Sequence, residues 1–402
     1  MSDTVLLTAP RWWDGHRART GARVLVADGR IADTDCRLPP PGATRLDLPG
    51  HTLLPGLIDC HVHLAQTPEA PAPPTTAGQA LAALPVLRAL LANGFTTVRD
   101  LGSTLRDPPT VHLRHALRAG TVPGPRLLVA PHIVSARAGH GDHSPHAAAP
   151  GDAESGAVAD GAGEVLRRVR LEARLQADWI KCAATGGLTS STDGPGRPTY
   201  TQDELDTLVA AAADLGLPCA AHAFSDEGIT RAVRAGVRSI EHACLATPPV
   251  LDLIADRGVF LVPTLHAVGF FLDRLDDDGY WAGRGEERAK LARHADTLRG
   301  HGARVAACRA ELAYGTDAGM FPHAQNWREF PAMTTAGLTP EQALRSATAT
   351  AGALLRLPGL GTLTVGAEAD LVAVPGDPLR DIDAMSAVDF VMQGGAVRHA
   401  PP

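Results

Sequence analysis

The chain has 402 residues, of which 45% are hydrophobic and 20% charged, and its formal net charge is −7 at pH 7. This composition is typical of a soluble globular protein and argues against disorder. The negative charge gives no reason to expect a nucleic acid or an anionic membrane as partner.

The compartment can be predicted from the N-terminus and the cysteines. The first residues, MSDTVLLTAPRWWDG, include an acidic residue at position 3 and no long apolar run, and the chain has no apolar stretch long enough for a membrane span. Its six cysteines form no CxxC pair, which favours reduced thiols over a disulfide framework. We therefore expect a cytoplasmic protein.

The two ends of the chain share one pattern. Residues 1–53 alternate short apolar and polar pieces around the turn residues Asp28 and Gly29, and residues 358–402 alternate in the same way. Each end is typical of a few antiparallel strands, but neither is long enough to bury a core alone. We predict that the two ends pair as one small β-sandwich.

Residues 54–357 show a repeated strand and helix pattern. Capping boxes at Thr201 with Glu204 and at Thr339 with Gln342 mark helix starts between short apolar runs. Eight such runs occur, at residues 54–63, 95–100, 125–131, 178–184, 218–223, 238–243, 258–265 and 311–318. Eight βα units predict an α/β fold of the (β/α)8 TIM-barrel type rather than an open doubly wound sheet, and the chain has no GxGxxG loop.

Reactive side chains gather at the ends of these predicted strands. His61 and His63 end the first strand and, being two residues apart, point to the same side. The fourth, fifth, sixth and eighth strands end with Lys181, His222, His242 and Asp317. Two histidines alone would be weak evidence, but barrel enzymes carry their active sites at the carboxyl ends of the strands, so the six together predict a metal site.

Lys181 is unusual in its surroundings. The chain has only two lysines among 37 basic residues, and Lys181 lies in the apolar sequence DWIKCAATGG. A buried strand excludes a charge unless the charge is paired or used.

These motifs resemble those of the amidohydrolase superfamily, and more narrowly those of its imidazolonepropionase-like branch, which contains metal-dependent Xaa-Pro dipeptidases. The resemblance extends over almost the whole chain. It rests on PGLID and HVH (55–63), TVRD (97–100), Lys181, His222, EH (241–242), GTDAG (315–319), GTL (361–363), ADLV (369–372) and GDPL (376–379).

The resemblance implies a binuclear centre of divalent ions, usually zinc. His61, His63 and Asp317 would hold the more buried ion, and His222 and His242 the more exposed one. Lys181 would bridge both as N6-carboxylysine, because an ammonium cannot bind a cation. Imidazole and carboxylate ligands suit zinc.

The resemblance also implies the reaction. A hydroxide that bridges the ions would attack a small amide or an Xaa-Pro-type dipeptide, and Asp317 would move the proton to the departing nitrogen. Hydrolysis of a cyclic amide, an imidazolone or a lactone is an alternative on the same centre. A catalytically silent metal-binding scaffold is another, against which the intact ligand set argues. The exact substrate, the metal used in the cell and a homo-oligomeric state stay open.

Three residues are candidates for contact with a small-molecule substrate. His140 lies in the Gly-, Ala- and His-rich loop 136–162, whose length is typical of an active-site lid, and it matches a substrate-binding histidine of the dipeptidase-like relatives. Phe224 stands where those relatives often have Tyr, so a hydroxyl that could bind a substrate carboxylate is missing. His266 stands where an apolar residue is expected.

Two further histidines of the loop and two residues of the second strand are less informative. His143 and His146 follow His140, and all three loop histidines could equally be solvated surface groups. Arg99 and Asp100 lie one strand away from any ligand, so we expect them to be structural or to support the ligands.

Overall fold

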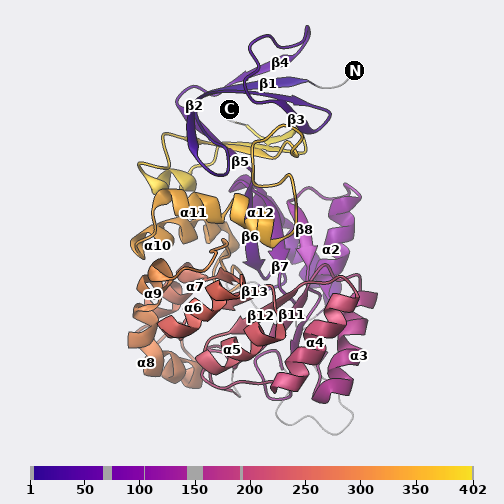
Figure 1. The fold of residues 1–402 in the computed structure, drawn as a ribbon, viewed down its shortest axis with the longest axis vertical. Coiled ribbons are helices and arrows are strands. Elements are labelled where there is room, and N and C mark those ends of the chain that lie inside the picture. The colour runs from indigo at the N-terminus through magenta and orange to yellow at the C-terminus, as the bar shows by residue number, and fades with distance from the viewer. Residues whose placement is uncertain (1–3, 67–74, 104, 143–156, 191–192, 401–402) are drawn as a thin grey trace.

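The computed structural model describes residues 4–66, 75–103, 105–142, 157–190 and 193–400. They form a β-sheet built from both chain ends and a larger part in which helices surround parallel strands (Figure 1). The prediction of an α/β barrel fold with a smaller β-structure made by both ends is confirmed. The domain boundaries at residues 53 and 358 stay a prediction.

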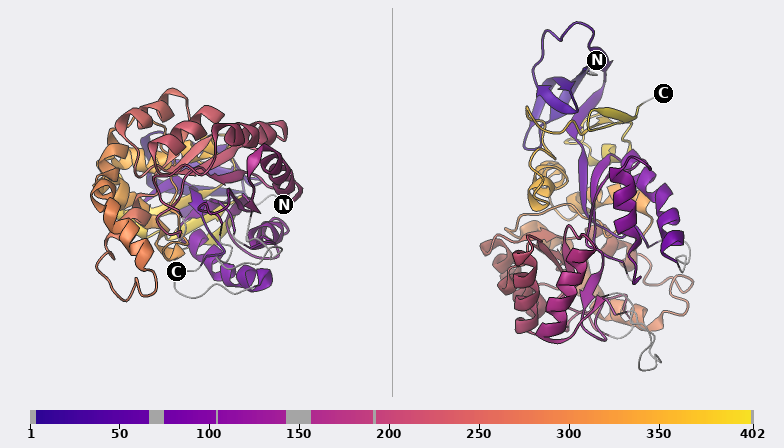
Figure 2. Two further views of the ribbon diagram at one scale, coloured as in Figure 1. Left: turned by 90° about the horizontal axis from the view of Figure 1, so that it is seen from below. Right: turned by 90° about the vertical axis from the view of Figure 1, so that its right-hand side faces the viewer.

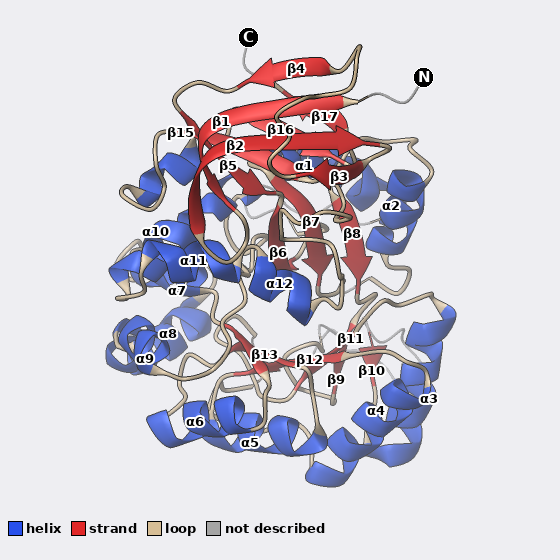
Figure 3. Cartoon of the chain, turned by 45° about the horizontal axis from the view of Figure 1, so that its top comes forward, coloured by secondary structure: helices blue, strands red, loops and turns tan. Residues whose placement is uncertain are grey.

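The sheet from the two ends has eight strands joined by hydrogen bonds (Figure 3). Its order is β17-β16-β15-β5-β1-β2-β3, and β4 pairs with β1. The strands are β1 (Val5–Trp13), β2 (Ala18–Ala27), β3 (Arg30–Asp33), β4 (Thr44–Asp47), β5 (His51–Pro55), β15 (Leu371–Pro375), β16 (Phe390–Gln393) and β17 (Ala396–His399). Strand β5 joins the two chain ends, because it runs parallel to β1 and pairs antiparallel with β15, with Leu53 opposite Ala373.

The barrel strands are parallel, and the first of them follows β5 directly in the chain. One sheet has the order β6-β7-β8 and another the order β10-β9-β11-β12-β13-β14. Their bounds are β6 (Leu57–Val62), β7 (Phe95–Asp100), β8 (Arg126–Val129), β9 (Ile133–Ser135), β10 (Ala157–Val158), β11 (Ile180–Ala183), β12 (Cys219–Ala223), β13 (Ser239–His242) and β14 (Phe260–Val262). Seven of the eight predicted runs therefore contain a strand.

The eighth predicted run, residues 311–318, is not a regular strand, and that expectation was wrong in detail. Single bridges join Leu312 to Leu261 of β14 and Ala318 to Val62 of β6, so the segment still lies between the two strands. The chain turns near the end of this segment, where Asp317 has a φ of 61°. Such a backbone angle interrupts an extended strand.

Helices cover the outside of the barrel (Figure 2). They are α1 (Thr76–Ala92), α2 (Pro109–Arg118), α3 (Gly161–Arg174), α4 (Gln202–Asp214), α5 (Asp226–Ala235), α6 (Pro248–Asp256), α7 (Leu265–Leu272), α8 (Gly285–Arg299), α9 (His301–Ala307), α10 (Glu329–Thr335), α11 (Pro340–Ser346) and α12 (Ala349–Leu354). Short 3-10 helices span His323–Arg328 and Ile382–Ser386. The two predicted capping boxes start α4 and α11.

Two further expectations from the sequence concern membrane helices and disulfide bonds. No helix in the described ranges is long and apolar enough to cross a membrane. All six cysteines lie within those ranges and are free, in agreement with reduced thiols.

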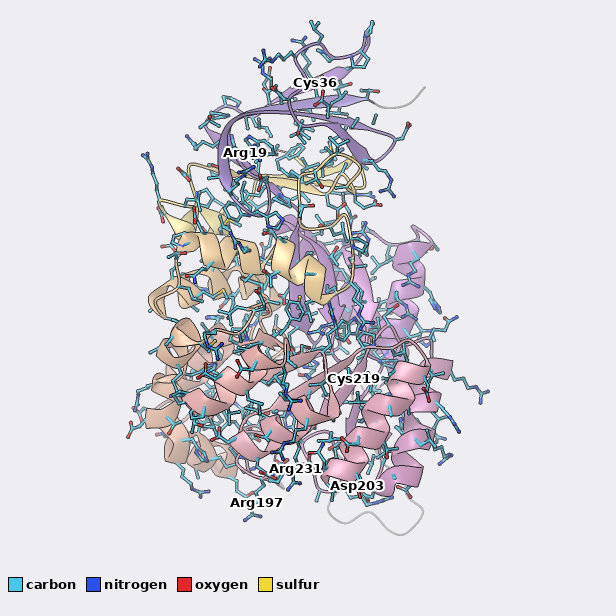
Figure 4. The ribbon with its side chains drawn as sticks, viewed as in Figure 1. Arg19, Cys36, Arg197, Asp203, Cys219 and Arg231 are labelled. Atoms are coloured by element: carbon cyan, nitrogen blue, oxygen red, sulfur yellow. The ribbon has the colours of Figure 1, made fainter. Side chains whose placement is uncertain are left out.

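The carboxyl ends of the barrel strands point away from the terminal sheet. The arrows of β6, β7 and β8 show this direction in Figure 3. In Figure 4, Cys219 marks the start of β12, whereas Arg197 and Asp203, which follow β11, lie at the end of the molecule remote from the sheet. The terminal sheet thus supports the barrel from the side opposite to the predicted site.

Asp370 fastens the terminal sheet to the barrel. Its side chain is almost fully buried, accepts from Arg126 Nη1 at 3.0 Å and accepts from the backbone N–H of Gly394 at 2.8 Å. Its own carbonyl accepts from the N–H of Gly56 at 2.8 Å, at the junction between β5 and β6. A buried carboxylate with charged and backbone donors joins both parts of the molecule here.

We expect Asp370→Ala to lower the free energy of unfolding by about 2 kcal/mol, because it removes a buried carboxylate that accepts hydrogen bonds from Arg126 and from the N–H of Gly394. Urea denaturation measures the change. Asp256→Ala is the control, because it removes an exposed ion pair to Arg309 and should move the midpoint little. Equal shifts in both variants would contradict this role of Asp370.

Candidate metal centre

The structure brings all six predicted ligands to one cavity. They come from the end of β6, from β11, β12 and β13, and from the segment after residue 311, and they line a cavity of about 660 Å³ together with His140 and Phe224. The six residues are His61, His63, Lys181, His222, His242 and Asp317.

Three of these side chains form the tightest group. His61 Nε2 and His63 Nε2 each lie 3.3 Å from Asp317 Oδ1. The three ligand atoms all lie within 4.8 Å of one another, an arrangement that could hold a metal ion.

Hydrogen bonds fix which ring nitrogen of each histidine faces the cavity. His61 Nδ1 donates to Glu241 Oε2 at 2.9 Å, and His63 Nδ1 donates to the carbonyl of Gly102 at 3.0 Å. A carboxylate and a carbonyl only accept, so each Nδ1 carries the proton and, in the neutral rings, each Nε2 presents a lone pair to Asp317. Lone pairs that face a carboxylate repel one another unless a cation lies between them, so the residues fit a divalent ion.

The second pair of histidines follows the same logic. His222 Nε2 donates to the carbonyl of Gly186 at 3.1 Å, which leaves Nδ1 without a proton, and His242 Nδ1 is hydrogen-bonded to Thr264 Oγ1 at 2.8 Å. The two ring centroids are 4.8 Å apart. Burial lowers the pKa of both histidines well below the usual value, which favours the neutral imidazole that binds metals.

Asp317 and Lys181 carry the charges of the site. Burial alone would raise the pKa of Asp317, but the charge of His61 and hydrogen bonds from His61 and His63, when these rings are protonated, hold it well below the usual range, so Asp317 is a carboxylate. Lys181 is only 2% exposed, and no group in the described part of the chain forms a hydrogen bond or ion pair with its Nζ. Burial lowers its pKa to about 8, against the attraction of Glu241 and Asp317.

The backbone is strained around the same cavity. His242, Thr264 and Asp317 have φ angles of 74°, 48° and 61°, in the left-handed region that residues other than glycine rarely adopt. Such strain persists where surrounding contacts enforce it, and it is concentrated at functional sites. Here it turns the side chains of His242 and Asp317 toward one centre.

A buried ion pair behind His61 is the functional feature that the sequence analysis did not assign. Glu241 accepts from His61 Nδ1, and its other oxygen accepts from Arg99 Nη2 at 3.0 Å and from Ser239 Oγ at 2.5 Å. Arg99 also donates to the carbonyl of Cys60 at 2.6 Å, and its guanidinium lies over the ring of Trp179. The EH motif at 241–242 was the available signal, but sequence gave no reason to pair Glu241 with the preceding strands.

The candidate substrate contacts are placed differently. His140 stacks on His222 with ring centroids 4.0 Å apart, and Gly187 permits this approach, because a Cβ there would lie 2.2 Å from His140 Nδ1. The Phe224 ring lies 4.5 Å from that of His222. His266 is not among the described residues that line the cavity, and its ring packs against Phe321. Its contact with substrate therefore stays a prediction. His143 and His146 lie outside the described residues.

Several known proteins resemble this chain in sequence and fold. A model of the amidohydrolase family matches residues 52–398. The ochratoxinase of Aspergillus niger is 31% identical over 377 residues, which are 87% of this chain and 76% of that protein. The crystal structure of a Xaa-Pro dipeptidase with bound methionine is 32% identical, has a TM-score of 0.92 and covers 99% of this chain and 100% of its own. A prolidase complexed with N-methylphosphonate-L-proline is also 32% identical, with a TM-score of 0.88 and the same coverage.

Fold, site and comparisons define a hydrolase that acts on carbon–nitrogen bonds. The chain belongs to the amidohydrolase family. The resemblance to its prolidase-like branch is likewise confirmed.

We expect Glu241→Gln to weaken the binding of a divalent ion at His61 by about 10- to 100-fold, because partners behind a ligand fix its tautomer and orientation. Competition with a chromophoric chelator measures this affinity. Glu172→Gln is a matched control, since Glu172 is a buried carboxylate that accepts from His132 and Arg168 but does not line the cavity. An equal loss of affinity in both variants would show that Glu241 acts only on folding.

Proposed function

We propose that the protein is a binuclear metal-dependent amidohydrolase that cleaves the carbon–nitrogen bond of a small amide or an Xaa-Pro-type dipeptide. The observation that carries this proposal is the set of histidine nitrogens and carboxylate oxygens that face one centre inside the cavity. Similarity to a solved Xaa-Pro dipeptidase and to a prolidase supports the substrate class.

Each proposed ligand has a place in this centre. His61, His63 and Asp317 would hold one ion, His222 and His242 the other, and Lys181 would join the two ions as N6-carboxylysine. Zinc suits this combination of nitrogen and oxygen donors. When bound, two divalent ions polarise the carbonyl group under attack and make a water nucleophilic at neutral pH.

Asp317 carries the proton transfer in this proposal. It is ionised, so its carboxylate can accept a proton from the attacking water and deliver it to the nitrogen of the departing amine. An amine leaves poorly without that proton. The Nε2 atoms of His61 and His63 lie 3.3 Å from this carboxylate.

Lys181 has the environment that carboxylation requires. Burial lowers its pKa to about 8, so a larger fraction of neutral amine is present at neutral pH than for an exposed lysine. The neutral amine is the form that adds to carbon dioxide. The resulting carbamate is an anion and can bind metal ions, which the ammonium cannot.

A second candidate function rests on Phe224. Its ring lines the cavity beside His222 and has no hydroxyl to bind a substrate carboxylate. Hydrolysis of a cyclic amide, an imidazolone or a lactone would not need that contact.

Metal content tests the centre. We expect the purified protein to hold about two equivalents of divalent ion, and we expect prolonged chelation to abolish activity that zinc, cobalt or manganese restores. Lys181→Arg keeps the positive charge but cannot form the carbamate, so it should lose nearly all activity and one ion. Lys290→Arg replaces the other lysine and should retain both. Full activity after verified removal of metal would overturn the proposal.

Paired substrates separate the two candidate functions. If a free carboxylate is bound, His140→Ala should lower kcat/KM for carboxylate substrates by about 30- to 150-fold, the equivalent of 2 to 3 kcal/mol, and affect neutral amides or esters much less. Phe224→Tyr should shift preference toward Xaa-Pro dipeptides. If the wild type prefers the neutral member of each pair and neither variant alters the ratio, the second candidate function is favoured.

A further inference from the structure

Helix α7 forms one side of the cavity, beside the proposed metal ligands. The cavity has an apolar wall and, next to it, a charged rim. The apolar wall consists of Ala267, Val268 and Phe271 of α7, and the charged rim consists of Arg284 and Glu287 at the start of α8. The position of the apolar wall therefore depends on the turn at which α7 begins.

This turn, residues 263–266, joins β14 to α7 and also contacts a proposed metal ligand. Thr264 is fully buried, and its Oγ1 is hydrogen-bonded to His242 Nδ1 at 2.8 Å. The bond leaves Nε2 of His242 as the nitrogen available to an ion. One short turn thus contacts a ligand and begins the helix that carries the apolar wall.

Thr264 holds its hydroxyl beside His242 in a strained backbone conformation. Its φ is 48°, in the left-handed region, which is unfavourable for a side chain branched at Cβ. Such a conformation costs about 1 to 3 kcal/mol and persists only where surrounding contacts enforce it. The contacts that hold this turn are therefore the contacts that aim the hydroxyl at His242.

Glu329 supplies two of these contacts from α10, which packs against α7. Its Oε1 accepts from the N–H of Leu265 at 2.8 Å, and its Oε2 accepts from the N–H of His266 at 2.7 Å. The side chain is completely buried, and a buried carboxyl group is costly unless donors satisfy it. His301 of α9 holds the same turn, because its Nε2 donates to the carbonyl of Pro263 at 3.2 Å.

We propose that Glu329 is a positioning residue that fixes the turn 263–266 and, through the Thr264 hydroxyl, orients His242 for metal binding. Glu329 is not among the described residues that line the cavity, so it acts on the metal centre only through this turn. The inference rests on the proposed function, which makes His242 a ligand of the second ion. Because α7 begins at the same turn, a change at Glu329 reaches the metal centre and the apolar wall together.

Zinc affinity, measured by competition with a chromophoric chelator, tests this role without turnover. Glu329→Gln keeps the shape of the side chain but replaces one acceptor oxygen with an amide nitrogen that cannot accept. We expect it to weaken the binding of one of the two zinc ions about 10-fold, and Thr264→Val, which removes the hydroxyl, to weaken it by about 10- to 100-fold. Glu172→Gln, at a buried carboxylate bonded to His132 and Arg168, should leave both ions unaffected.

A double variant separates positioning from a general effect on folding. If Glu329 acts through Thr264, Glu329→Gln adds little to the loss that Thr264→Val already causes, because both changes act on one contact with His242. Additive losses, or an equal loss in Glu172→Gln, would overturn the role of Glu329. If Glu329→Gln does not fold, His301→Phe removes another contact to the same turn, and unchanged zinc binding in that variant would overturn the inference.

Turnover separates this inference from the proposed function. A wild-type protein that binds two zinc ions but hydrolyses no amide or dipeptide would refute the proposed function, and the losses of zinc affinity in the variants would still establish the role of Glu329. Hydrolysis by the wild type together with unchanged zinc binding in Glu329→Gln would refute the role of Glu329 alone.

Discussion

The convergence of His61 Nε2, His63 Nε2 and Asp317 Oδ1 on one point is the arrangement on which the site depends. The two nitrogens lie 3.3 Å from the same carboxylate oxygen, and each histidine donates its Nδ1 proton away from the cavity. Rotation of either ring would break a buried hydrogen bond, which costs about 1 to 3 kcal/mol. The site is therefore arranged for a cation before one arrives, as a preorganised centre requires.

The protein around this group keeps it in place from several directions. Glu241 and Arg99 form a buried ion pair behind His61, with Arg99 resting on Trp179. Gly315 allows the segment before Asp317 to approach β6, because a Cβ there would lie 2.9 Å from His61 Cβ. The terminal sheet closes the opposite side of the barrel and is tied to it through Asp370. Both chain ends thus support the barrel from the side opposite to the cavity, and the carboxyl ends of the barrel strands stay available for the functional site.

Much of this arrangement follows from local sequence patterns. The spacing of His61 and His63 places them on one side of a strand, and strand ends in a barrel converge, so the gathering of the six side chains in one cavity could be predicted without knowing any distance. The irregular shape of the segment around Asp317 could not be predicted from the sequence, because it depends on contacts with β6 and β14. The pairing of Arg99 with Glu241 also joins strands far apart in the chain, and Arg99 was assigned a supporting role without a partner. His266 illustrates a different outcome. A histidine was unexpected at this position and was therefore predicted to contact the substrate, but its ring lies among aromatic side chains and not in the cavity lining.

The chemistry of the cavity beyond the ligands accounts for how one fold serves several amide substrates. The ligand-bearing strands are short and buried, whereas the apolar wall and the charged rim come from α7, α8 and the loop between them. Loops and helices on this face can change without disturbing the strands that hold the ligands. Phe224 is an exception, because it follows β12 directly and lies beside His222. We therefore expect a substitution of Phe224 to affect His222 as well as the cavity lining.

Anomalous X-ray diffraction from crystals of zinc-loaded protein tests the central claim most directly. The account predicts two zinc peaks in the cavity. One should lie about 2.0 to 2.2 Å from His61 Nε2, His63 Nε2 and the Asp317 carboxylate, and the other at the same distance from His222 and His242, with density for a carbamate on Lys181 between them. A single peak, or zinc bound only outside the cavity, would contradict the binuclear centre.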